Sequence, residues 1–126
     1  MINEFIEKAR TNLAVANLCF ENGFFDAAAN RAYYAAFQAA VAALARHGFI
    51  KDRLDHEWVQ SQMSAQLIRR AKLCPDKIKS YLPKMQAVRN IADYEPKLTG
   101  KKVAQRQIAK AEEMISVIEK EVIEND

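Results

Sequence analysis

The chain has 126 residues, half of them hydrophobic, with only three glycines and three prolines. This length is typical of one domain with a single core, and the scarcity of turn-forming residues argues against a β-sandwich or β-barrel. The formal net charge of +3 is mildly basic, which is compatible with a nucleic-acid partner without requiring one.

Two long helices are predicted first. Over residues 3–21, apolar residues recur every three or four positions, which places them on one helix face, and Asn22-Gly23 ends the pattern. A second helix is predicted over residues 26–46, before His47-Gly48. This helix has an apolar stripe on one face and a polar stripe on another. The polar stripe consists of Asn30, Arg31, Tyr34 and Gln38.

A loop over residues 49–56 is followed by three further predicted helices. The first covers residues 57–73, and Cys74-Pro75 ends it because proline cannot continue a helix. The second is a short helix that ends near Ala92. The last covers residues 100–124, with the preceding threonine as a candidate N-cap.

The short helix starts at either Asp76 or Ser80. Pro83 favours the later start, with Ser80 as N-cap, because proline fits the first turn of a helix. Long helices with short connections fold back antiparallel. We therefore expect residues 1–126 to form one all-α domain, an antiparallel four-helix bundle with the short helix as an additional element.

The sequence carries no sign of export or membrane insertion. The first residues contain acidic side chains and lack the apolar run of a signal peptide. No stretch approaches the roughly 20 consecutive apolar residues that cross a bilayer. The two cysteines, Cys19 and Cys74, are too few for a disulfide framework, and we expect buried free thiols. These features predict a cytoplasmic protein with no membrane segment.

Most familiar site chemistries lack their residues here. Three scattered glycines do not form a phosphate-binding loop, and the cysteines and histidines are isolated from one another. We therefore expect no metal and no cofactor. We interpret His56 as a surface or capping histidine and Trp58 as a core residue.

Polar residues gather at the end of the short helix, in the segment Arg89-Asn90-Ile91-Ala92-Asp93-Tyr94. It combines a cation, an amide, a carboxylate and a phenol. Arg89 and Asp93 are four positions apart, so they share a helix face and can pair. From chemistry alone, a surface salt bridge with a packed tyrosine explains this segment as well as a functional site does.

Two segments of the chain resemble the HEPN family of small helical bundles. Residues 30–40, Asn-Arg-Ala-Tyr-Tyr-Ala-Ala-Phe-Gln-Ala-Ala, are similar to the family's Ser-Arg-Ala-Tyr-Tyr-Ala-x-Phe-His pattern. Residues 89–94 are similar to the Arg-x-x-Ala-Asp-Tyr form of its functional motif. The first segment is fairly specific and the second alone is weak, but together they occur in the expected order on the expected helices. The resemblance covers nearly the whole chain.

The resemblance implies a homodimer with a cleft at its two-fold axis. Many HEPN proteins are metal-independent ribonucleases of toxin–antitoxin, phage-defence and RNA-processing systems. Their bacterial partner is often a minimal nucleotidyltransferase that acts as antitoxin. The resemblance therefore implies the toxin-like component of such a pair, which acts on or binds RNA at the dimer cleft.

The motif departs from the family pattern at one position. Active HEPN proteins have a histidine four to six residues after the arginine, and Tyr94 stands there instead. No other arginine of the chain is followed by a histidine at that spacing. Histidine accepts and donates protons near neutral pH, whereas a tyrosine side chain, with an ordinary pKa of about 10, is a poor base.

The resemblance nevertheless suggests catalytic roles for four residues. Arg89 binds phosphate and Asn90 positions it. Asp93 orients the arginine, and Tyr94 replaces the histidine as a weak acid or hydrogen-bond donor. Two copies of Arg89 across a symmetric cleft would form a concentrated positive pocket.

Three residues of the second helix are candidate substrate-binding residues. Arg31, Tyr34 and Gln38 would extend the wall of the pocket. Simpler roles are open for two of them: Arg31 would pair with Asp93 and fix the contact between helices, and Tyr34 would serve bundle packing.

Two other functions also fit the sequence. In the first, a non-catalytic HEPN module binds a nucleotide or docks its partner enzyme in the same cleft, and the Tyr94 hydroxyl accepts a transferred nucleotide. In the second, the chain is a structural helical adaptor with no ligand.

Overall fold

The computed structural model describes residues 1–124, which contain five α-helices and no strand. The predicted all-α fold, a helical bundle with an additional helix, is confirmed. The helices are α1 (Ile2–Glu21), α2 (Phe25–Arg46), α3 (His56–Gln62), α4 (Tyr81–Tyr94) and α5 (Lys101–Val117).

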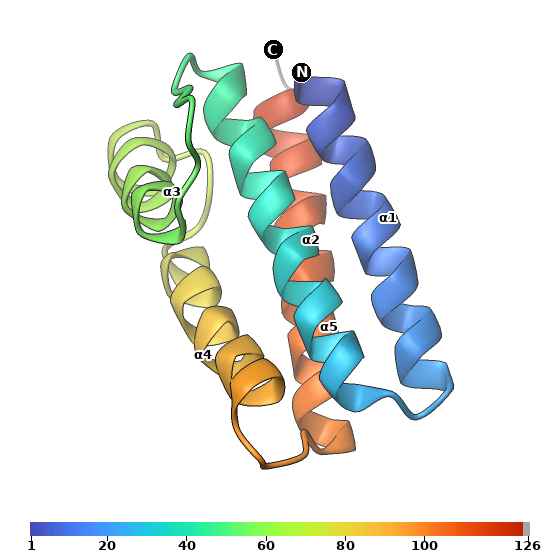
Figure 1. Cartoon of the computed structure of the whole chain (residues 1–126). Helices are drawn as coiled ribbons and strands as arrows, with labels where there is room; N and C mark the ends of the chain where they lie inside the picture. The colour runs from blue at the N-terminus through green and yellow to red at the C-terminus, as the bar shows by residue number, and fades with distance from the viewer. Residues whose placement is uncertain (125–126) are drawn as a thin grey trace.

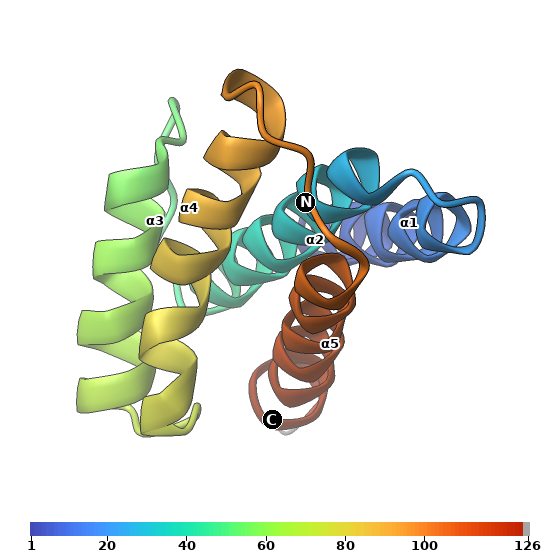
Figure 2. The ribbon, with the colours of Figure 1, turned by 90° about the horizontal axis from the view of Figure 1, so that it is seen from below.

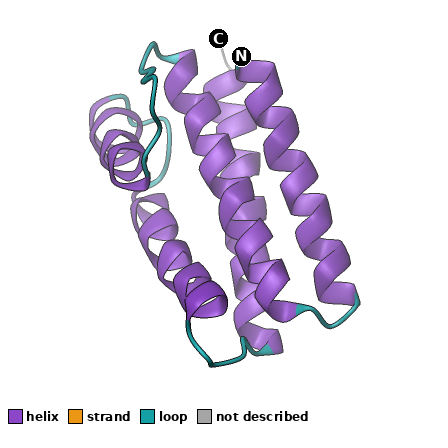
Figure 3. Ribbon diagram, viewed as in Figure 1, coloured by secondary structure: helices purple, strands orange, loops and turns teal. Residues whose placement is uncertain are grey.

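Three short segments extend these helices. Helix α3 continues in a wider π-helical winding over Met63–Arg70, and α5 does the same over Ile118–Ile123. A 3-10 segment, Asp76–Ser80, leads into α4. The remaining connections are short loops (Figure 3). No helix among the described residues is both long enough and apolar enough to cross a membrane.

Helix α2 lies at the centre of the bundle and contacts each of the other four helices. Helices α1, α2 and α5 run lengthwise in Figure 1, with α1 and α2 antiparallel. Helix α3 is seen end-on in that view and lengthwise in Figure 2. The helix that departs from the common direction is therefore α3, rather than the short segment that the sequence suggested.

The composition of α2 explains its central place. Most of its alanines are buried, and their small side chains let α1 and α5 approach closely. The predicted apolar stripe of α2 is buried throughout; it comprises Tyr33, Phe37, Ala40, Val41 and Leu44.

Several predicted helix ends are confirmed by the backbone. Gly23 and Gly48 adopt positive φ angles of 78° and 84°, the left-handed conformation that glycine tolerates. Pro83 is the third residue of α4, in the first turn, where no intrahelical N–H bond is required. Glu95 is extended and ends α4 directly before Pro96.

Both predicted N-caps are wrong. Ser80 does precede α4, but its hydroxyl donates to the Lys77 carbonyl and caps no N–H of the helix. The N-cap of α5 is Gly100, and the backbone N–H of Thr99 instead donates to Asp26 Oδ1 at 2.8 Å. The Asp26 carboxylate thus ties the start of α5 to the start of α2.

The predicted helix over residues 57–73 ends early, at Arg70. Lys72 has a positive φ of 54°, which reverses the chain before the proline is reached. Of the two cysteines, Cys74 is buried and Cys19 is partly exposed. Burial raises the pKa of the Cys74 thiol to about 11, so this thiol stays protonated at neutral pH.

One buried polar residue fixes α5 against its neighbours. Gln107 is 2% exposed, and its Nε2 donates to the Met85 carbonyl of α4 at 2.8 Å and to the Ala29 carbonyl of α2 at 3.5 Å. A buried amide that is hydrogen-bonded to two helices restricts how they slide past each other. This contact sets the depth at which α4 lies on α2, and with it the position of the polar segment at the end of α4.

Candidate functional site: an arginine cluster between α2 and α4

The last turns of α4 lie against the first half of α2, so the two polar segments found in the sequence meet. We call the resulting group the Arg89 cluster. Its members are Asn30, Arg31 and Tyr34 from α2 and Arg89, Asn90, Asp93 and Tyr94 from α4.

Arg89 is the centre of this cluster. Its Nη2 donates to the Tyr34 hydroxyl at 2.8 Å and makes a longer contact of 3.5 Å with the Tyr94 hydroxyl. Its Nη1 donates to Asn90 Oδ1 at 3.1 Å. One of the two Nη1 N–H groups therefore has no acceptor among the described residues. The side chain is fixed on three sides and still has a donor to offer.

The predicted pair between Arg89 and Asp93 is present. Arg89 Nε lies 2.9 Å from Asp93 Oδ2, and the two side chains are only 13% and 23% exposed. The Nε–H bond is not directed at that oxygen, and this buried nitrogen has no hydrogen-bond acceptor within residues 1–124. The contact is an ion pair that orients the guanidinium. Asp93 Oδ2 also accepts a hydrogen bond from Asn30 Nδ2 at 2.8 Å, so the carboxylate is anchored to α2.

The direct pair between Arg31 and Asp93 that the sequence allowed is wrong, because Asn30 lies between them. Asn30 Oδ1 accepts from Arg31 Nε at 2.8 Å and from Arg31 Nη2 at 2.6 Å, while its amide nitrogen reaches Asp93. Arg31 Nη1 donates to Asn12 of α1 at 3.2 Å. Asn30 thus links the two arginines through one carboxylate.

Tyr34 lies between two guanidinium groups. The Arg31 and Arg89 Cζ atoms are each 5.3 Å from the centre of its ring. This distance is typical of cation–π contacts, in which the electron-rich face of the ring offsets part of the repulsion between nearby cations. Tyr34 is also partly buried and packs edge-on against Tyr33 and Phe37. It therefore does serve packing, and it also holds Arg89.

The outer rim of the cluster is open to solvent. Tyr94 is 72% exposed, with its ring 5.5 Å from the Arg89 Cζ atom, and Asn90 is exposed beside it. Two guanidiniums and one carboxylate give the cluster a formal charge of +1. Its exposed donors and positive charge suit an anionic ligand, and arginine in particular suits phosphate.

Gln38 does not join this cluster. It lines a separate groove between α2 and α1, together with Asn12 and the acidic residues Glu4 and Glu7. Its Oε1 is buried and has no hydrogen-bond donor within the described chain. A groove with two carboxylates does not favour an anionic ligand, so the wall of the cluster is formed by Arg31 and Tyr34 without Gln38.

The sequence interpretation missed His56. This residue is neither a surface nor a capping histidine: it is the first residue of α3, and the N-cap is Asp55, whose carboxylate accepts from the Trp58 N–H. The His56 ring packs on α2, with its Nδ1 2.6 Å from the Tyr33 hydroxyl and its ring centre 6.3 Å from that of Tyr34. No motif could have revealed it, because its spacing from Arg89 along the chain matches no family pattern.

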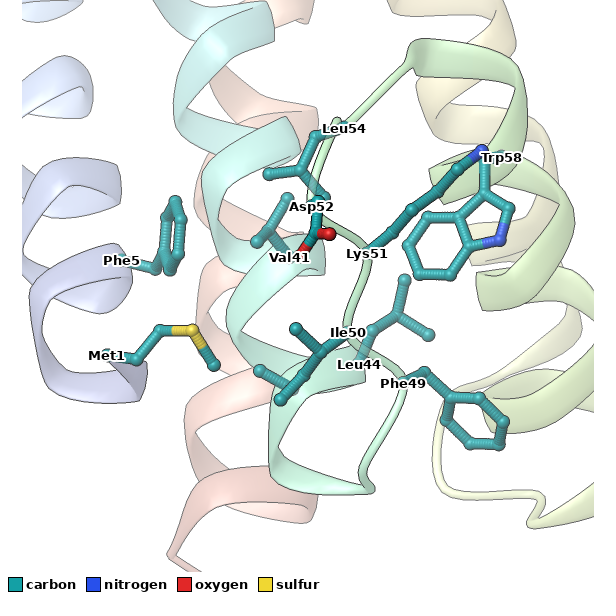
Figure 4. A pocket seen from close by; sticks show the side chains of 11 residues that line it. Met1, Phe5, Val41, Leu44, Phe49, Ile50, Lys51, Asp52, Leu54 and Trp58 are labelled. Atoms are coloured by element: carbon teal, nitrogen blue, oxygen red, sulfur yellow. The ribbon is translucent and has the colours of Figure 1, made fainter.

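The molecule also has an apolar cavity of about 300 Å³ at the other end of α2 (Figure 4). Its lining includes Phe5, Leu44, Ile50 and Trp58, with Lys51 and Asp52 at the side. Apolar walls and a pair of opposite charges give no means of recognising phosphate. Trp58 packs against the core as well, as the sequence predicted.

Metal ligands are not gathered anywhere in residues 1–124, where no three histidine, cysteine or acidic side chains lie close enough to share an ion. Comparison with curated proteins finds no match for the chain. The sequence profile of the HEPN domain, in contrast, matches residues 2–122, which is nearly the whole chain. The chain therefore belongs to the HEPN domain family.

Proposed function

We propose that this protein is the toxin-like component of a HEPN/nucleotidyltransferase pair, and that it binds RNA and cleaves it without a metal ion at the Arg89 cluster. The observation that carries the proposal is the state of Arg89. Its guanidinium is fixed by Tyr34, Asp93 and Asn90, yet one Nη1 N–H remains without an acceptor in the described chain. A preorganised donor of this kind binds a phosphate oxygen without first having to be ordered.

Two protomers would complete the site. In a homodimer with the two-fold axis beside α4, each protomer would contribute one Arg89 cluster to a shared cleft. The doubled positive charge would attract the RNA backbone and stabilise the charge that develops on phosphorus during cleavage. The exposed Asn90 and Tyr94 support this arrangement because they leave the rim of the cluster uncovered.

The roles of the cluster follow from its contacts. Arg89 holds the phosphate, Asp93 fixes the direction of Arg89, and Asn30 anchors Asp93 to α2. Asn90 positions the same phosphate from the rim. Tyr94 offers its hydroxyl to the leaving oxygen or to a phosphate oxygen.

RNA cleavage in the presence of a chelator tests this function. Purified protein is incubated with tRNA and with mRNA in EDTA, beside Arg89→Ala and the matched control Arg70→Ala, which removes an exposed arginine outside the cluster. We expect cleavage by the wild type and by Arg70→Ala, and its loss in Arg89→Ala. Equal product from wild type and Arg89→Ala would overturn the proposal.

A non-catalytic module is the second candidate, favoured by Tyr94 at the place of the motif histidine. In that case the cluster binds a nucleotide or the partner enzyme, and the hydroxyl, 72% exposed, accepts a nucleotide from the nucleotidyltransferase. Intact-mass spectrometry after co-expression with a nucleotidyltransferase encoded by a neighbouring gene separates the two candidates. The second predicts a mass increase that is absent in Tyr94→Phe, together with no RNA cleavage by the unmodified protein.

A further inference from the structure

The Arg89 cluster lacks the motif histidine, but an imidazole reaches its neighbourhood from another part of the chain. The loop after α2 returns His56 to the surface of α2. There the His56 ring lies with its centre 4.9 Å from that of Phe37 and 6.3 Å from that of Tyr34. Tyr34 in turn accepts a hydrogen bond from Arg89. A single side chain therefore separates this imidazole from the guanidinium.

The hydrogen bond to Tyr33 holds the imidazole in one orientation. Tyr33 is fully buried, and burial raises the pKa of its hydroxyl to about 12, so the hydroxyl stays neutral across the physiological range. A neutral hydroxyl can donate to His56 Nδ1 or accept from it. The opposite nitrogen, Nε2, has no partner in residues 1–124 and is not buried. It is therefore able to take up a proton or to release one.

The charged and titratable groups around His56 keep it neutral at pH 7. Burial lowers its pKa below the ordinary 6.5, and the charge of Arg89 on α4 lowers it further. The neighbouring Asp55 carboxylate raises it, by less than the other two effects lower it. Tyr33 and Tyr34 of α2 face the ring as uncharged phenols at this pH. A neutral imidazole beside a phosphate-binding arginine is in the state that a general base requires.

We propose that His56 is the proton acceptor for RNA cleavage at the Arg89 cluster, and that Tyr33 is the positioning residue that holds it. This inference rests on the proposed function. His56 Nε2 takes the proton of the ribose 2′-hydroxyl as that oxygen attacks the adjacent phosphorus. The P–O2′ bond forms and the P–O5′ bond breaks. The products are a 2′,3′-cyclic phosphate and a 5′-hydroxyl, whose proton comes from the Tyr94 hydroxyl or from water, and the imidazolium returns its proton to solvent.

The cleavage test uses His56→Asn, because the asparagine side chain keeps a hydrogen-bonding atom near the position of Nδ1 and does not titrate. Cleavage of a single-stranded RNA in EDTA and binding of the same RNA are both measured, with His47→Asn as the matched control on the exposed histidine. We expect His56→Asn to bind RNA within about twofold of wild type and to cleave it about 100-fold more slowly or less, the range of general-base catalysis. Thermal unfolding followed by circular dichroism verifies that the variant is folded.

A second measurement reports on His56 without catalysis. The two histidines give separate imidazole NMR signals, which are titrated with pH in the presence and absence of a single-stranded oligodeoxynucleotide that lacks the 2′-hydroxyl and cannot be cleaved. A bound phosphate near His56 should raise the apparent pKa of His56 and leave that of His47 unchanged. A purely structural histidine would not respond to the oligonucleotide.

The outcomes separate the two proposals. If the wild type cleaves RNA, Arg89→Ala does not, and His56→Asn cleaves as the wild type does, the role of His56 is refuted and the proposed function stands. If the wild type binds RNA through Arg89 without cleaving it, catalysis by His56 is refuted and RNA binding stands. If the wild type neither binds nor cleaves RNA, the proposed function fails and the role of His56 fails with it.

Discussion

The hydrogen bond between Tyr34 and Arg89 provides a quantitative test of how the cluster is held together. The Tyr34 hydroxyl accepts from Arg89 Nη2 at 2.8 Å, and the Arg89 side chain is 13% exposed. Hydrogen bonds to charged groups contribute about 1.5 to 3 kcal/mol, and because Arg89 has other partners we take the lower end, about 1.5 kcal/mol. Tyr34→Phe removes this bond and keeps the ring between the two guanidiniums.

A double-mutant cycle isolates the contact. The free energies of unfolding of Tyr34→Phe, Arg89→Met and the double variant are measured in urea by circular dichroism. The double variant should lose about 1 kcal/mol less than the sum of the single losses, because the shared bond is counted only once. Tyr34→Leu also removes the ring that lies against both arginines, so it should cost a further 0.5 to 1 kcal/mol or so for each stacking contact.

The control cycle combines Tyr34→Phe with Arg10→Met. Arg10 pairs with Glu119 of the C-terminal π-helical segment and does not touch the cluster, so the two changes should add. A coupling free energy of zero, within about 0.3 kcal/mol, between Tyr34 and Arg89 would refute the claim that this bond fixes the guanidinium.

Three further predictions concern the fold, the motif and pH. Gln107→Ala should lower the free energy of unfolding by about 1 to 3 kcal/mol because it removes a buried, doubly hydrogen-bonded amide, whereas the exposed Gln105→Ala should stay within about 0.5 kcal/mol of wild type in the same thermal melts. Tyr94→His should raise the rate of RNA cleavage in EDTA because it restores an imidazole beside the arginine; an unchanged rate would contradict the role given to this position. Since burial, followed by a nearby positive charge, lowers the pKa of His56 below 6.5, the unfolded chain binds more protons than the folded one just below that pH. Stability should therefore fall as the pH is lowered through 6.5 and level off above it, with a weaker fall in His56→Asn and an unchanged one in His47→Asn.

The sequence predicted the parts of the fold that depend on local chemistry. Glycines at 23 and 48 and the proline at 96 ended helices where expected, because their backbone preferences act within a few residues. The early end of the helix at Arg70 depends on the left-handed Lys72, which no turn residue announced. Both N-caps failed for a tertiary reason in one case: the N–H of Thr99 is satisfied by Asp26, a residue on another helix.

The same distinction applies to the site. The pair of Arg89 and Asp93 follows from their spacing on one helix, and the structure contains it. The link through Asn30 and the approach of His56 depend on how α2, α3 and α4 pack, so spacing along the chain could not reveal them. Gln38 shared the polar stripe of α2 in the sequence, but its side chain faces α1. Position on a helix therefore indicated the right face for Arg31 and Tyr34 and not for Gln38.

The salt dependence of RNA binding tests most directly that Arg89 binds RNA phosphate. Binding of a labelled single-stranded RNA is followed by fluorescence anisotropy over a series of KCl concentrations, for wild type, Arg89→Ala and Arg70→Ala. Each phosphate neutralised on a single strand contributes about 0.7 to the slope of log affinity against log salt. Arg89→Ala is predicted to bind more weakly with a slope reduced by about 0.7, or about 1.4 if both protomers of a dimer contribute, while Arg70→Ala retains the wild-type slope. Equal affinity and equal slope for wild type and Arg89→Ala would contradict the account.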